Sequence, residues 1–265
     1  MGSRMTWLER LLIDCLMVLL WFGGLAVPLR AGARDEETEV RPGFSWGAES
    51  EACSRYLWRG IPWSEGAVLQ PSVLAFSGGW SFEVWANFDL RGGGAERGLN
   101  EIDLSLAYEK EWPSLAIESG LNVFVYPGPG SVSDPPTVEA VLNLSLALAG
   151  PVSVFIENAL DVGAYPGGYF GEAGFRLEYQ LHPALGLEAS ASQSFATQTF
   201  NGSYWDVSRS LFNGAFLRVA LTWSFGPGFF VRSRVEEVIL TAGPIREAAG
   251  RGSFFAVGLA VGVEQ

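Results

Sequence analysis

Charged side chains recur at every second position along several apolar segments of the chain. In Ser81–Leu90, for example, Glu83 and Asp89 share one parity, while Phe82 and Val84 share the other. Opposite charges on one face of a sheet can form hydrogen-bonded ion pairs, and carboxylates around a narrow passage favour cations. The pattern therefore predicts either a structural network of ion pairs or a selectivity filter.

The candidate residues of this charged face extend through most of the repeating region. They are Arg55, Arg59, Glu83, Asp89, Glu101, Asp103, Glu118, Glu139, Glu157, Asp161, Glu172, Arg176, Glu178, Glu188, Arg218, Arg232, Arg234 and Glu236. Carboxylates outnumber arginines in this set, so a passage lined by it would favour cations over anions. In the alternative, the arginines and carboxylates pair across the interior and fill it.

Catalytic and metal chemistry find little support in the residue types present. His182 is the single histidine and lies in a predicted turn, with no serine and orienting acid arranged beside it as a hydrolase requires. One histidine and Cys53 cannot supply a typical transition-metal site. We expect no enzyme activity, no catalytic residue, no metal and no cofactor.

The charged positions must lie on β-strands, because successive side chains of a strand point to opposite faces of the sheet. Alternation bounded by Gly, Pro, Asn and Asp clusters predicts about twelve strands. Their expected ranges are 47–58, 67–76, 80–90, 100–110, 115–126, 137–149, 152–162, 168–181, 185–196, 212–225, 229–240 and 254–264. Most have the length that a tilted strand needs to cross a bilayer, about 9–11 residues.

Short and long connections alternate between these strands. The short ones are 77–79, 111–114, 150–151, 182–184 and 226–228, and the long ones are 60–66, 91–98, 127–136, 163–167, 197–210 and 241–252. An up-and-down meander would place all short turns at one end and all long loops at the other, as in outer-membrane barrels. We therefore predict an all-β fold, a single antiparallel transmembrane β-barrel. A soluble β-sandwich is the alternative.

The N-terminus has the pattern of a secretory signal. Arg4 and Arg10 precede the apolar run Leu16–Val27, and Ala31–Ala33 offers a small-residue cleavage site. We expect a signal peptide over 1–33, a flexible periplasmic leader over 34–45 and the barrel over 46–265, with a retained membrane anchor as the alternative at the N-terminus. The net charge of −12 disfavours nucleic acid as a partner.

Aromatic side chains near the predicted strand ends are those expected of interfacial girdles. The candidates are Trp58, Trp80, Trp112, Tyr126, Tyr169, Tyr179 and Trp223. Together with the apolar strand faces they predict outer-membrane lipid as a partner and the outer membrane of a Gram-negative bacterium as the location. The sequence gives no indication of an oligomeric state.

One part of the chain resembles a known family. The motifs that carry the resemblance are Ser54–Gly60 (Ser-Arg-Tyr-Leu-Trp-Arg-Gly), Gln70–Ser72, Trp80–Asp89, Glu101–Asp103, Glu118–Gly120, Tyr126–Pro127 and Glu139. This pattern, over residues 50–160, is similar to that of the TorF-like family of porins. The resemblance implies an outer-membrane barrel with a transport role and no defined substrate. The last strand departs from many outer-membrane proteins, because it ends Val263-Glu264-Gln265 without a terminal aromatic residue.

The sequence thus predicts a porin or channel for small solutes with a charged, acid-rich lumen. The alternative function is a non-conducting exported barrel whose lumen is plugged by pairs of Arg with Glu or Asp, and which serves as a structural or surface-binding protein.

Overall fold

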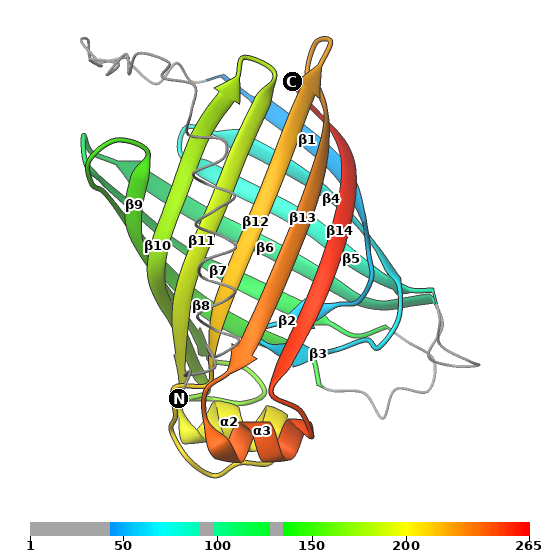
Figure 1. Ribbon diagram of the computed structural model, residues 1–265, viewed down its shortest axis with the longest axis vertical. Coiled ribbons are helices and arrows are strands. Elements are labelled where there is room, and N and C mark those ends of the chain that lie inside the picture. The colour runs from blue at the N-terminus through cyan, green and yellow to red at the C-terminus, as the bar shows by residue number, and fades with distance from the viewer. Residues whose placement is uncertain (1–42, 91–97, 128–134) are drawn as a thin grey trace, which may run out of the picture. The chain divides into compact units, whose positions relative to one another are not determined.

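Twelve antiparallel strands form a closed barrel in the computed structural model, which describes residues 43–90, 98–127 and 135–265 (Figure 1). The barrel strands are β1 (Ser45–Cys53), β4 (Val68–Ser77), β5 (Trp80–Asp89), β6 (Gly98–Glu111), β7 (Leu115–Val125), β8 (Thr137–Ala147), β9 (Val152–Asp161), β10 (Tyr169–His182), β11 (Leu185–Ala196), β12 (Gly214–Phe225), β13 (Phe229–Leu240) and β14 (Ser253–Glu264). Each strand pairs with its neighbours in the chain, and β1 closes the ring against β14. This confirms the predicted fold class.

Short turns join strands at the end of the barrel that holds the C-terminus, and longer connections lie at the other end (Figure 1). The turn between β4 and β5 consists of Gly78 and Gly79, with φ angles of +58° and +87°. A two-residue hairpin turn with positive φ at both positions matches the twist of the flanking strands, and glycine adopts it without steric cost.

The two faces of the sheet differ sharply in polarity. Along β12, the side chains of Val219, Leu221 and Trp223 are exposed on the outer face. Polar side chains such as Asn87 and Glu139 are almost completely buried on the inner face. A soluble protein buries its apolar face, so this inverted arrangement suits a barrel surrounded by lipid.

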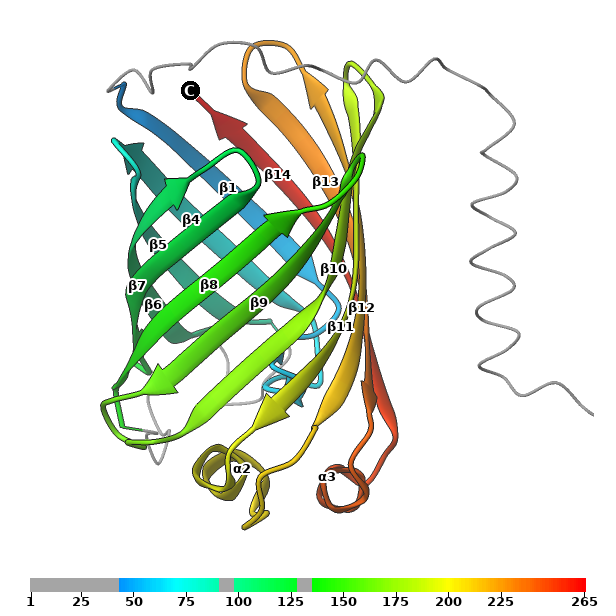
Figure 2. The same ribbon diagram turned by 90° about the vertical axis from the view of Figure 1, so that its left-hand side faces the viewer.

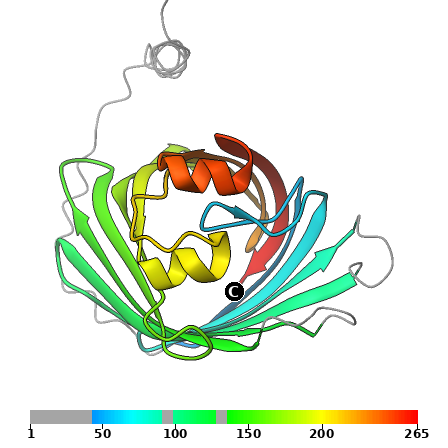
Figure 3. The same cartoon turned by 90° about the horizontal axis from the view of Figure 1, so that it is seen from below.

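Smaller elements cover the long-connection end. The hairpin of β2 (Leu57–Trp58) and β3 (Ile61–Pro62), together with α2 (Gln198–Trp205) and α3 (Gly243–Ala249), lies across the barrel opening (Figures 2 and 3). Neither α2 nor α3 is long and apolar enough to cross a membrane, and the described residues form no other helix.

An apolar cluster joins these covering elements to the barrel wall. Its buried members are Ile61, Phe170, Ala196, Phe200, Phe216, Val238, Leu240, Ile245 and Phe254, contributed by the hairpin, both helices and strands β10–β14. We call it the mouth cluster. It replaces a conventional hydrophobic core at this end of the barrel.

The largest error in the predicted boundaries is the end of the first strand, and two of the predicted long loops contain short helices. The first strand ends at Cys53 rather than 58, because the chain turns after Ser54 and packs Tyr56 inside the barrel. The connections predicted as loops over 197–210 and 241–252 contain α2 and α3. The predicted signal peptide, and all of the predicted leader except 43–45, lie outside the described residues.

Candidate functional site

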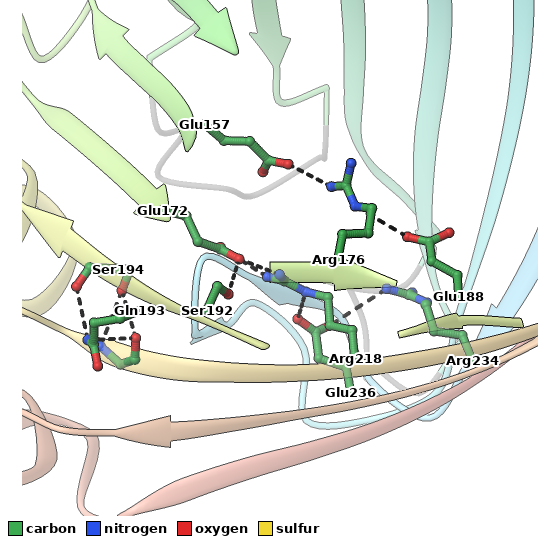
Figure 4. Close-up of polar contacts among 11 residues, drawn as sticks. Glu157, Glu172, Arg176, Glu188, Ser192, Gln193, Ser194, Arg218, Arg234 and Glu236 are labelled. Carbon is green, nitrogen blue, oxygen red and sulfur yellow. Dashed lines mark hydrogen bonds and ion pairs between the residues drawn. The ribbon is translucent and has the colours of Figure 1, made fainter. Parts of the chain in front are cut away.

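Arginines of β10, β12 and β13 form a chain of ion pairs along one wall of the barrel interior, which we call the lumen (Figure 4). Arg176 donates a hydrogen bond from Nη2 to Glu157 Oε1 at 3.0 Å, and its Nε lies 3.7 Å from Glu188 Oε1. Arg218 pairs with Glu172 at 2.5 Å and with Glu236 at 2.9 Å. Each guanidinium thus lies between two carboxylates.

The same wall continues across the strands that close the ring. Arg234 donates two hydrogen bonds to the carboxylate of Glu51, at 3.0 and 2.8 Å, and lies 3.5 Å from Glu236. Arg232 pairs with Glu49. Bidentate pairs of this kind orient both partners and neutralise the arginine charge locally. Each of the four arginines of this wall is therefore neutralised by at least one of the six carboxylates around them.

Phenylalanine rings hold several arginines against this wall. The guanidinium of Arg218 lies 4.6 Å from the ring centroid of Phe216, and that of Arg232 lies 5.6 Å from Phe230. In both cases the ring stands two residues before the arginine, on the same face of the strand. Sequence reasoning did not use this repeated Phe-x-Arg spacing, although it predicts such a stacked arrangement.

Strands β5–β8 form an acidic wall on the other arc of the ring. Glu83, Asp103 and Glu118 have no Lys or Arg within 4.0 Å among the described residues. Asn143 donates a hydrogen bond to Glu118 at 2.8 Å. Glu101 is almost fully buried on the same wall. The two walls therefore differ in charge balance.

Neutral hydrogen bonds connect the lumen side of β4 to the acidic wall. Gln70 donates to Asn87 at 3.0 Å, and Asn87 donates to Asn100 at 2.7 Å. Asp89, at the end of β5, stands opposite Val68 and Gly98. These amides satisfy buried polar groups without adding positive charge.

Asp161 has a local structural role at the end of β9. It accepts a hydrogen bond from Thr137 at 2.7 Å and others from the backbone N–H groups of Gly163 and Tyr165 at 2.9 and 3.0 Å. Glu178 lies near the short-turn end of β10, exposed and directly opposite Glu188. Neither residue forms an ion pair with arginine or lysine within the part of the chain that is described.

A cavity of about 410 Å³ lies between the arginine wall and strands β4 and β5. Arg55, Glu83 and Trp85 are among its lining residues, and Trp85 packs against Tyr56 with ring centroids 5.3 Å apart. Arg55 has no ion pair in the described ranges. The cavity thus presents separated positive and negative groups beside aromatic rings.

Arg59 and Trp58 lie in the β2–β3 hairpin rather than on a barrel strand. Arg59 forms a bidentate pair with Glu139 of β8, at 2.6 and 2.5 Å. Trp58 was predicted as an interfacial aromatic, but it packs inside the barrel against Phe124 and Phe200, with ring centroids 6.0 and 5.8 Å apart. That prediction was wrong because residues 54–58 do not continue the first strand.

The remaining predicted aromatics occupy both ends of the barrel. Trp80, Trp112, Tyr179 and Trp223 are exposed at or beside the short turns. Tyr126 and Tyr169 are half-buried at the other end, where the Tyr169 hydroxyl donates to Asn158 at 2.6 Å. Lys110 lies 5.5 Å above the ring of Trp112. Exposed aromatic and basic side chains of this kind suit a membrane interface.

Metal and histidine chemistry gain no geometric support. No group of three or more His, Cys, Asp or Glu side chains in the described residues is arranged to hold a metal ion. His182 was predicted in a turn, but it is the exposed last residue of β10, where its Nδ1 accepts a hydrogen bond from the backbone N–H of Ala184 at 3.2 Å. This contact explains the conformation of the turn.

Comparisons with known proteins place the fold. No family model matches the chain, and no curated protein matches it, so the TorF-like resemblance stays a prediction. The KdgM porin is similar to this chain at a TM-score of 0.50 and 11% identity, over 83% of this chain and 97% of that one. The NanC porin is similar at a TM-score of 0.53 and 10% identity, over 82% and 98%. The chain therefore has the fold of outer-membrane porin barrels.

Proposed function

We propose that this protein is an outer-membrane channel for small solutes in a Gram-negative bacterium, exported by a signal peptide over 1–33 that leaves a short leader over 34–45. The inverted polarity of the barrel supports this proposal, because an exposed apolar exterior is stable in lipid and a polar interior holds water. The porin fold and the exposed aromatics beside the short turns agree with it.

The proposed lumen prefers cations. The main support for this preference is the difference between the two walls of the lumen. The arginines of β10–β13 are each paired with carboxylates, whereas Glu83, Asp103 and Glu118 have no cationic partner among the described residues. The net field of such a passage is negative, and it attracts cations and repels anions.

The solute class proposed here differs from that of one structural neighbour. That neighbour is described as a KdgM porin in complex with disordered oligogalacturonate, which is a chain of acidic sugars. The unpaired carboxylates of the present lumen would repel such a polyanion. We therefore propose small cations and neutral solutes as its cargo.

A second candidate function is a non-conducting barrel that serves as a structural or surface-binding protein. The observation that favours it is the filled mouth: the apolar mouth cluster and the Arg59–Glu139 pair occupy the long-connection end. In that case the ion pairs of the lumen would only stabilise the barrel.

Liposome swelling separates the two functions. Purified full-length protein in liposomes is diluted into isotonic solutions of small neutral sugars or of potassium and chloride salts, with protein-free liposomes as the control. The channel predicts swelling that falls as solute size rises. Heat-modifiable gel mobility verifies that the barrel is folded. A folded barrel that gives no swelling with any solute would contradict the channel function and favour the structural or surface-binding role.

A further inference from the structure

The β2–β3 hairpin has a strained and specific geometry. Its two central residues, Arg59 and Gly60, both have positive φ angles, +52° and +83°. Trp58 and Ile61 pair across the turn, as in a two-residue hairpin of the primed type. Arginine seldom adopts this conformation, and an arginine held there indicates that the surroundings over-determine its position.

A buried ion pair with Glu139 of β8 determines the position of Arg59. Its side chain is 13% exposed and that of Glu139 is 2% exposed. The guanidinium also lies 4.4 Å from the ring centroid of Trp58, 5.1 Å from that of Phe170 and 5.8 Å from that of Phe200. Three aromatic faces and a bidentate carboxylate thus surround one charge.

The hairpin also touches the arginine side of the ring. A Cβ built on Gly60 would lie 3.2 Å from Val238 Cγ1 and 3.6 Å from Phe216 Cζ, so its backbone is in contact with β12 and β13. Strand β8, which carries Glu139, lies four and five places from β12 and β13 in the ring of twelve. The hairpin therefore contacts strands of both walls, and Figure 3 shows it extending into the opening between α2 and α3.

The forces that hold this hairpin are of two kinds. Ile61 belongs to the apolar mouth cluster, which is a non-directional contact. The Arg59–Glu139 pair is directional, and a buried pair is only marginally favourable because both charges lose their hydration. Moving the hairpin out of the lumen would rehydrate both ions and cost mainly apolar contacts. Such an element can have two states of similar free energy.

We propose that the β2–β3 hairpin is a gate that closes the long-connection end of the lumen. The apolar contacts of Ile61 and the Arg59–Glu139 pair together hold it shut, and loss of either partner leaves an uncompensated buried charge that favours opening. This inference rests on the proposed channel function. Cys53, Tyr56 and Val68 pack together at the base of the hairpin and fix the point from which it swings. The helix α2 covers the closed hairpin through contacts of Tyr204 with Trp58 and Trp63, at 5.1 and 6.3 Å between centroids.

The test uses single-channel recording of the full chain in planar bilayers. Glu139→Gln keeps the shape of the side chain and removes its charge, and Arg59→Gln removes the positive charge of the hairpin with a shorter side chain. The gate predicts a roughly tenfold rise in open probability for each, since about 1.4 kcal/mol suffices for a tenfold shift in a two-state equilibrium. The exchanged pair, Arg59→Glu with Glu139→Arg, is expected to recover most of the closed state. Arg209→Gln, an exposed loop change, is the matched control.

Hydrogen–deuterium exchange of residues 57–62 provides a readout that does not depend on conduction. Faster exchange in Glu139→Gln together with a higher open probability supports the gate. Faster exchange with an unchanged open probability in a conducting protein would contradict the proposed gate, while the proposed channel function would stand. If no variant conducts, including one with 57–62 replaced by a Gly-Ser linker, the proposed channel fails and the gate fails with it.

Discussion

Gly258 explains how an ion pair can form across an intervening strand. It stands opposite Arg234 of β13 on one side and opposite Cys53 of β1 on the other. A Cβ built at this position would lie 2.1 Å from Glu51 Oε1 and 3.1 Å from Cys53 Sγ. The missing side chain therefore leaves the space in which Arg234 reaches Glu51 over β14.

Replacing Gly258 with valine is expected to break this pair. The added methyl groups displace the Glu51 carboxylate and leave Arg234 with its longer contacts to Glu236 and Cys53. We expect a loss of about 1–3 kcal/mol of folding free energy, typical of a hydrogen bond to a charged group. Urea unfolding in lipid vesicles measures it, with Leu259→Val on the outer face as the control. Equal stability of both variants would show that the pair contributes little.

Tyr204 gives the mouth cluster a sensitivity to alkaline pH. Burial, and then the negative charge of Glu139, raise the pKa of Tyr204 above its ordinary value of 10.0. The unfolded phenol therefore ionises at a lower pH than the folded one, so its contribution to stability is complete below pH 10 and is lost as the pH rises further.

The expected result is a fall in the urea midpoint of the native protein between pH 9 and pH 11, as the unfolded tyrosine ionises. In Tyr204→Phe this fall becomes smaller, because phenylalanine keeps the apolar contacts and cannot ionise. The remaining tyrosines are common to both proteins. Parallel curves for the two proteins would exclude Tyr204 as a cause.

At the scale of the strand, β12 shows the two unlike faces most clearly. Val219 is 45% exposed on the outer face near the middle of the strand, and Thr222 lies on the inner face. If lipid surrounds the barrel, Val219→Arg costs about 2–4 kcal/mol at the bilayer midplane. Thr222→Arg is expected to cost much less, since the lumen hydrates the charge. Unfolding in vesicles compares them, and equal costs would argue against a lipid-facing exterior.

The barrel strands could be predicted because their alternation is long and their turns carry glycine or proline. The strands β11 and β13 agree with their expected ranges at both ends. The first strand could not be placed correctly, since Arg55, Leu57 and Arg59 continue an alternating pattern although the chain has already turned inward. Periodicity does not distinguish a strand that continues from a hairpin that packs against it.

The sequence predicted which charged residues of the candidate site share one face of the sheet, but it did not predict which of them form ion pairs with one another. Parity placed Arg234 and Glu51 on one side of their strands, but their pairing depends on closure of β1 against β14 and on the gap at Gly258. The pairing of Arg59 with Glu139 depends on the path of the hairpin through the lumen. Neither partner could be found from local sequence, because both contacts join strands distant along the chain.

At the scale of the whole molecule, the two ends of the barrel are predicted to face different compartments. The long connections should be extracellular and the short turns periplasmic. In a Cys53→Ala background, Ser208→Cys is expected to react with a membrane-impermeant maleimide in intact cells, and Pro227→Cys only after lysis. Both positions are exposed on the protein. Reaction of Pro227→Cys alone in intact cells would reverse the proposed orientation.

The central claim is that the lumen conducts small solutes and prefers cations. The most direct test is the reversal potential of the purified protein in a planar bilayer under a potassium chloride gradient. A cation-preferring lumen predicts current steps that reverse close to the potassium equilibrium potential, since the carboxylates of Glu83, Asp103 and Glu118 dominate the field. No conductance, or a reversal potential close to that of chloride, would contradict it.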